Sequence, residues 1–210
     1  MSAENSNGKN GGPRTALNIR YMTVTAMLSA LAFILMFFDF NIPLMPSFIK
    51  MDISELPALI GAFAMGPLYG VAICLIKNLL HLFVSQTGGV GELSNFILGA
   101  SFVCTAGLIY SKRKSKSTAV IGSFIGALVM AVISVPSNYY IVYPAYTRFM
   151  PIDAILSMYQ AINPRADSLL KCLLMFNAPF TFVKGMVSVL ITLLIYKRIS
   201  PIIKGTRTQS

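Results

Sequence analysis

The chain has 210 residues, of which 55% are hydrophobic and only 11% are charged, and its net charge is +10 at pH 7. Soluble domains carry about 25% charged residues, so this composition excludes a domain with a fully water-covered surface and predicts an integral membrane protein. The length suits one membrane domain, and we expect no separate ATPase domain because its sequence motifs are absent.

The lysine and arginine residues flank apolar segments and do not form a basic patch with stacking aromatics. We therefore expect no nucleic-acid binding. The cysteines are scattered through apolar sequence without metal-ligand spacing or an even-numbered framework, so packing roles are expected for Cys74, Cys104 and Cys172.

Residues 1–19 are polar and rich in Gly, Asn and Ser, which predicts a disordered cytoplasmic tail. The first apolar span is expected at 21–38. A signal peptide is the alternative, but this run is long enough to stay in the membrane and no convincing cleavage site follows it. Within the span, Ala26 and Ala30 form a small-xxx-small pair that permits close approach of another helix, either of this chain or of a partner.

An apolar, proline-containing loop follows at 39–52, and we interpret it as a lid over an apolar site, with dipping into the lipid interface as the alternative. Two spans are expected next, at 54–65 and 68–86, because Gly66-Pro67 interrupts the helical ladder. The first of them is short, which a membrane protein tolerates where protein encloses the helix. Ser54 is the expected cap of this helix, near Asp52 and Glu55.

The later part of the chain predicts three more spans. They are expected at 92–110, after a Gly-Gly-Val-Gly turn, at 118–142 and at 172–196, with a polar loop at 143–171. Eleven of the 17 lysine and arginine residues then lie on the predicted cytoplasmic side and four on the outer side, as the positive-inside rule requires. The predicted fold class is an all-α integral membrane protein, with a domain of six transmembrane helices over 20–199, a cytoplasmic tail at 200–210, both termini cytoplasmic and a ligand cavity near the outer side.

Polar side chains inside these spans indicate a binding cavity, because a charge in hydrocarbon costs roughly 2.5–3.5 kcal/mol and is usually kept for function or pairing. The candidate polar positions are Lys77, Asn78, Glu92, Asn95, Asn138, Asn177 and Lys184. An internal ion pair of Glu92 with Lys77 or Lys184 is the alternative. We expect the chain's single histidine, His81, to make a hydrogen bond near a helix end, and Lys77 and His81 to have structural roles.

No catalytic constellation is present: metalloprotease, serine-hydrolase and P-loop motifs are all missing, and His81 cannot build a multi-histidine metal site. We therefore expect neither enzyme activity nor a metal. The segment KNLLHLFVSQTGGVGELSNF (77–96), within a longer match over 50–99, resembles the riboflavin-specific substrate-binding subunits of energy-coupling factor (ECF) transporters. The resemblance extends to PSNYYIVYPAY (136–146) and PFTFVKG (179–185).

This resemblance covers nearly the whole chain apart from the tails. It implies six helices in the bacterial cell membrane and a site that captures riboflavin from outside with high affinity. It also implies association with a membrane-embedded coupling subunit and two cytoplasmic ATPases, which hydrolyse ATP while the bound subunit topples to release the vitamin inside. Riboflavin is then the transported ligand and no cofactor is expected.

The resemblance also implies roles for individual residues. Glu92, Asn95, Asn138 and Lys184 are expected to contact the flavin, and Leu44 and Met45 to belong to the covering loop. Thr181 stands where relatives are expected to have an asparagine, and a hydroxyl lacks the paired donor and acceptor of an amide. Asn177, one turn earlier, is a candidate to compensate. The pair of Ala26 and Ala30 matches the family's motif for docking on the coupling subunit.

Three alternatives to riboflavin import stay open at this point. The same architecture could take another vitamin or a phosphorylated flavin, although one cavity lysine neutralises a phosphate poorly. The chain could be a membrane-embedded enzyme that uses Lys77, His81 and Glu92. It could also be a channel that conducts without ATPases.

Overall fold

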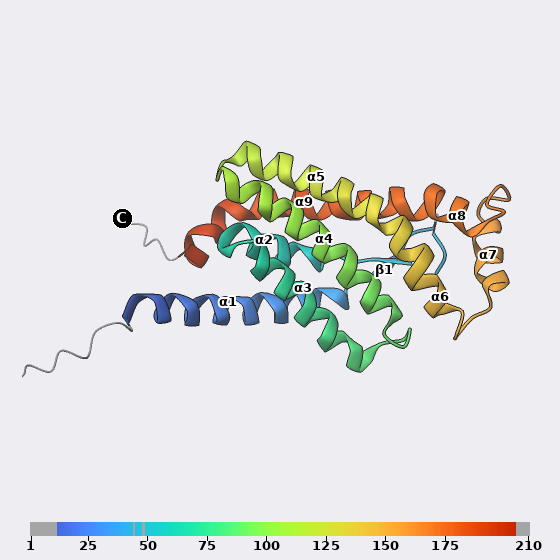
Figure 1. Cartoon of the computed structure of the whole chain (residues 1–210), viewed down its shortest axis with the longest axis horizontal. Helices are drawn as coiled ribbons and strands as arrows, with labels where there is room; N and C mark the ends of the chain where they lie inside the picture. Colours follow the sequence, from blue (N-terminus) through green and yellow to red (C-terminus); the bar gives the residue numbers. More distant parts are fainter. Residues whose placement is uncertain (1–11, 44, 48, 205–210) are drawn as a thin grey trace, which may run out of the picture.

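The computed structural model describes residues 12–43, 45–47 and 49–204, and within these the side chains from 19 to 195. Long helices run side by side along the longest axis of the molecule (Figure 1). They are α1 (Gly12–Met36), α3 (Pro67–His81), α4 (Val90–Lys112), α5 (Lys116–Ser137) and α9 (Ala178–Lys204), with the shorter α2 (Glu55–Met65) among them.

Shorter elements gather at one end of this bundle (Figure 1). The helical ones are η1 (Leu82–Val84), α6 (Tyr143–Tyr146), α7 (Ile152–Gln160) and α8 (Leu169–Cys172). Two strands of two residues each, β1 (Phe40–Asn41) and β2 (Lys50–Met51), pair antiparallel and close the loop between α1 and α2.

Five helical stretches are long and apolar enough to cross a membrane, which confirms an all-α, multi-pass membrane protein. They cover residues 19–36, 67–84, 90–112, 116–146 and 169–195. The other predicted span, α2, has 11 residues and so reaches only about 16 Å at 1.5 Å per residue. Every residue from Glu55 to Phe63 is buried. Because protein surrounds this short helix, its backbone and side chains are shielded from lipid.

The two ends of the bundle differ in the segments that they carry. The start of α1, the end of α9 and the basic connection between α4 and α5 lie at one end, and α6, α7, α8 and the strands lie at the other (Figure 1). Three segments that the sequence assigns to the cytoplasm therefore meet on the same side.

Helix boundaries differ from the predicted ones at both termini and in the outer loop. Helix α1 begins at Gly12 and α9 ends at Lys204, so helix extends into both predicted tails, while residues 1–11 and 205–210 lie outside the described residues. The prediction of a loop over 143–171 is wrong in part, because α6 and α7 lie within it and α8 begins in it. On α7, Ile155 and Tyr159 follow helical spacing and are buried in one apolar cluster.

Two π-helical segments, η2 (Asn138–Val142) and η3 (Leu173–Asn177), interrupt the last two long spans. At the end of each, a backbone N–H reaches the carbonyl five residues back: Tyr143 donates to Asn138, and Ala178 donates to Leu173. Each segment ends two residues before a proline, at 144 and 179. Proline has no N–H for the carbonyl four residues earlier, so we attribute the local shift of the ladder to these prolines.

A glycine turn joins η1 to α4, and Phe149 in the loop after α6 packs against this turn. Gly88 and Gly89 have positive φ angles of 61° and 89°, which other residues rarely adopt. A Cβ atom on Gly88 would lie 2.6 Å from the ring of Phe149. Glycine is therefore required here both by backbone conformation and by the close approach of the aromatic ring.

Candidate ligand-binding site

A cavity of ≈ 720 Å³ lies between the 37–52 loop, the ends of α3 and α4 near the glycine turn, and the two π-helical segments with the start of α9. This volume falls within the roughly 300–1,000 Å³ that small-molecule sites usually have. Its apolar walls include Met36, Leu98, Met130, Phe149 and Phe180. Such walls suit a ligand with a large flat or apolar part.

The structure brings most of the predicted site residues together around this cavity. The lining contains Glu92, Asn95, Asn138, Asn177, Thr181 and Lys184. Two other predicted residues lie differently: Met45 is half-buried and is not in the lining, whereas its loop neighbours Ser47 and Ile49 are. Leu44 lies outside the described residues.

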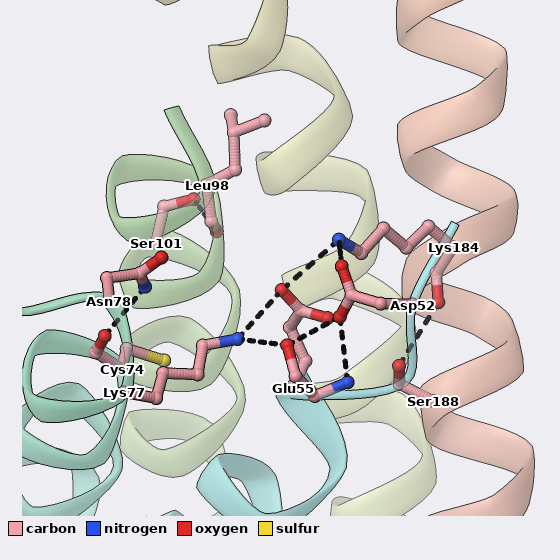
Figure 2. A network of polar contacts seen from close by, with 10 residues as sticks. Asp52, Glu55, Cys74, Lys77, Asn78, Leu98, Ser101, Lys184 and Ser188 are labelled. Atoms are coloured by element: carbon pink, nitrogen blue, oxygen red, sulfur yellow. Dashed lines mark hydrogen bonds and ion pairs between the residues drawn. The ribbon is translucent and has the colours of Figure 1, made fainter. Parts of the chain in front are cut away.

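Four charged side chains form a buried cluster beside the cavity (Figure 2). The ammonium of Lys184 lies 2.8 Å from Asp52 Oδ2 and 3.5 Å from Glu55 Oε1. Lys77 lies 3.2 Å from the same Glu55 oxygen, and both Lys77 and Glu55 have fully buried side chains. Two carboxylates thus face two ammonium groups, which makes the cluster neutral and offsets the cost of taking these charges out of water.

This cluster corrects one prediction and removes one alternative. Ser54 precedes α2 but makes no side-chain cap, because its hydroxyl donates to Asp52 and accepts a 2.5 Å hydrogen bond from Lys77. Glu92 pairs with neither Lys77 nor Lys184, since both lysines are paired with acids at the start of α2. Burial by itself raises the pKa of the Asp52 carboxyl, but the two ammonium groups outweigh burial and hold that pKa well below its usual range.

The two acids of the cluster were missing from the predicted site. Asp52 lines the cavity together with Lys184, whereas Glu55 and Lys77 lie behind it. A sequence signal did exist: the spans contain two lysines that need buried counter-charges, and Asp52 and Glu55 flank the start of the short helix that protein encloses. Lys184 consequently serves two purposes, as an ion-pair partner and as a cavity residue.

Glu92 is held at the cavity by the end of α3 and the glycine turn. Its Oε1 lies 2.7 Å from His81 Nδ1, and its Oε2 accepts hydrogen bonds from Ser85 at 2.8 Å and Thr87 at 3.3 Å. His81 thus makes the helix-end hydrogen bond that the sequence predicts, with Glu92 as its partner. These contacts fix the carboxylate as a hydrogen-bond acceptor in the cavity wall.

Side-chain amides supply further hydrogen-bonding groups. Asn138, on η2, accepts a 3.2 Å hydrogen bond from Ser94. The Oδ1 atom of Asn95 is buried and has no hydrogen-bond partner among the described residues. A buried acceptor without a partner costs about 1–3 kcal/mol, so a ligand donor placed at Asn95 would recover that energy.

The positions of the titratable side chains bear on whether the site could hold a metal ion or carry out catalysis. Among the residues that the structure describes, no three His, Cys, Asp or Glu side chains lie so that they could hold a metal ion. Lys77, which an enzyme was hypothesised to use with His81 and Glu92, lies in the ion cluster and not in the cavity lining. The described lining of the cavity combines apolar walls with polar groups.

Comparison with known proteins agrees with this geometry. The family model for the ECF transporter substrate-specific component matches residues 20–196. A riboflavin transporter, RibU, of Staphylococcus aureus (strain TCH60) is 33% identical over 187 residues, which cover 89% of this chain and 93% of that protein. The riboflavin transporter FmnP of Bacillus subtilis (strain 168) is 31% identical, over 91% of this chain and 98% of that protein.

A solved structure supports the same assignment at the level of the fold. It is described as the S component of a bacterial ECF transporter, has a TM-score of 0.71 and 31% sequence identity, and covers 89% of this chain and 99% of that chain. The resemblance drawn from the sequence is thereby confirmed for the family, whose members are transporter components and not enzymes. The chain belongs to the family of ECF transporter substrate-specific components.

Proposed function

We propose that this chain captures riboflavin outside the bacterial cell and delivers it to the cytoplasm as part of an ECF importer. The observation that carries the proposal is the ≈ 720 Å³ cavity at which six polar residues, singled out from the sequence, meet. The names of the two relatives support riboflavin as the ligand. In this proposal a membrane-embedded coupling subunit and two ATPases supply the energy for import, and the chain itself binds and releases riboflavin.

The two ends of the bundle support one orientation in the cell membrane. The end with the basic α4–α5 connection, the start of α1 and the end of α9 faces the cytoplasm in this proposal, as the positive-inside rule requires. The opposite end, with the strands and α7, faces outward, and the cavity is lined by residues of this outer half. Helix α2 then acts as a sixth, protein-enclosed membrane helix.

The charges of the cavity favour an uncharged flavin over a phosphorylated one. Both lysines among the described lining residues are already paired with carboxylates: Lys50 lies 3.0 Å from Asp39, and Lys184 lies 2.8 Å from Asp52. A phosphate group would enter a site whose cations are neutralised and which also contains Glu92. Riboflavin, with its neutral ring and hydroxylated side chain, needs only hydrogen bonds and apolar contacts.

Titration of the purified chain in detergent tests this proposal. Because the chain contains no tryptophan, quenching of the flavin's own fluorescence is the suitable signal. We expect riboflavin to bind one-to-one, and flavin mononucleotide to bind at least about tenfold more weakly, a difference of about 1.4 kcal/mol. Absence of quenching by the chain would remove riboflavin as the ligand, and equal affinities would contradict the charge argument.

A further inference from the structure

Tyr159 lies on α7, outside the cavity, and yet it is joined to a residue that lines it. Its side chain is 0% exposed, and α7 sits at the outer end of the bundle beside α6 and α8 (Figure 1). The hydroxyl of Tyr159 donates a 2.6 Å hydrogen bond to Oδ1 of Asn177, and Asn177 lines the cavity from η3. Tyr143, which also lines the cavity, is hydrogen-bonded to the same hydroxyl, so a residue of a peripheral helix is joined to two residues of the lining.

A closed ring of hydrogen bonds fixes the direction of this amide. The 2.6 Å separation is typical of an O–H···O bond and short for an N–H···O bond, so the oxygen of Asn177 faces Tyr159. Nδ2 of Asn177 donates to the hydroxyl of Tyr143 at 3.4 Å, and the hydroxyls of Tyr143 and Tyr159 are hydrogen-bonded to each other. Since Tyr159 donates to Asn177, Tyr143 must donate to Tyr159.

The ring leaves one group of Asn177 for a ligand. An amide nitrogen carries two N–H donors, and the bond to Tyr143 uses one of them. The carbonyl oxygen is engaged by Tyr159, which is not among the cavity-lining residues. We propose that Tyr159 is a positioning residue that turns Asn177 so that an amide N–H, and not the carbonyl, faces the ligand and selects a hydrogen-bond acceptor there.

Burial is consistent with Tyr159 acting as a hydrogen-bond donor. Burial, together with the neighbouring Tyr143, raises the pKa of Tyr159 well above its ordinary value, so its hydroxyl stays protonated and remains a donor. Thr181, one turn further along α9, lines the same cavity with a hydroxyl. Thr181 has no amide, so the N–H of Asn177 supplies an amide donor in this part of the cavity.

The test is a double-mutant cycle on the full-length chain, read by quenching of riboflavin fluorescence; it rests on riboflavin being the ligand. Tyr159→Phe removes the hydroxyl that holds Asn177, and we expect it to weaken binding about tenfold. Asn177→Ala is expected to weaken binding at least as much, and the double variant to bind no more weakly than Asn177→Ala. Tyr140→Phe, on the 74% exposed Tyr140 of η2, is the matched control and is expected to bind as wild type does.

The outcomes separate this inference from the proposed function. If the wild-type chain fails to quench riboflavin, the proposed ligand is wrong. If the wild-type chain binds but Tyr159→Phe binds equally well, or if the two losses multiply in the double variant, Tyr159 does not act through Asn177. Should Tyr159→Phe not purify as a folded protein, Asn177→Asp decides, because a carboxylate still accepts from Tyr159 but has no N–H to donate to a ligand. Undiminished binding by Asn177→Asp would overturn the inference.

Discussion

Replacing Lys184 by methionine is expected to destabilise the protein by about 3–5 kcal/mol and also to weaken riboflavin binding. The loss of stability arises because Asp52, 2.8 Å from Lys184, keeps a buried charge without its nearest partner. Adding Asp52→Asn restores a neutral cluster, so we expect the double variant to regain most of the stability without regaining the affinity. Thermal unfolding in detergent and a flavin titration measure the two effects separately.

An exposed ion pair provides the matched control. Lys171 lies 2.7 Å from Asp167, with both side chains more than half exposed, and it belongs to the outer part of the chain. Solvent screens such a pair, so Lys171→Met should change thermal stability little. An equal loss from Lys171→Met, or a further loss when Asp52→Asn is added to Lys184→Met, would contradict the role that we assign to the buried cluster.

Replacing both Ala26 and Ala30 by leucine is expected to abolish riboflavin uptake and to leave riboflavin binding unchanged. Both alanines are exposed on α1, whereas Thr25, Ser29 and Ala32 form its buried face. A small-xxx-small face allows close helix contact with a partner, and two leucine side chains would hold the coupling subunit away. Uptake is measured in cells that depend on imported riboflavin, and binding is measured with the purified chain.

The control for this variant adds bulk elsewhere on the lipid-facing surface. Val132 on α5 is 64% exposed, so Val132→Phe should affect neither uptake nor binding. Normal uptake by the variant that carries both alanine-to-leucine changes is the result that excludes a docking role for this face. Loss of uptake by Val132→Phe as well would mean that added bulk disturbs insertion generally.

The membrane fold and six polar residues of the cavity lining could be predicted from the sequence. Hydropathy and the break at Gly66-Pro67 placed the spans, and the resemblance pointed to Glu92, Asn138 and Lys184, which the structure brings to one cavity. These features can be predicted because the length of an apolar segment, and the polar residues within it, are read directly from the local sequence.

Pairing across the fold was harder to predict. Lys184 and Asp52 are 132 residues apart in sequence, and nothing local indicates which of the embedded charges will meet. A lysine partner for Glu92 was one alternative from the sequence, but Glu92 is partnered by His81 and two hydroxyls of its own turn. The partner of a buried charge depends on how the helices pack, and hydropathy does not predict helix packing.

The outer helices were missed for a different reason. Prolines and polar residues are scattered through 143–171, and the spacing of Ile155 and Tyr159 indicates the buried face of α7. The hydrogen bond from Tyr159 to Asn177 follows from that packing and could not be predicted without it.

The two π-helical segments have a consequence for how this site can change during evolution. Each holds one residue more than an α-helical ladder would, and one residue corresponds to a rotation of about 100° around the helix axis. Deletion or insertion of a single codon within η2 would therefore rotate Tyr143 and Tyr146, which follow this segment and line the cavity, relative to α5, whose apolar face keeps its contacts. The same change within η3 would rotate α8 relative to α9. A change of ligand preference could thus arise by a one-residue indel, without any substitution in the membrane core.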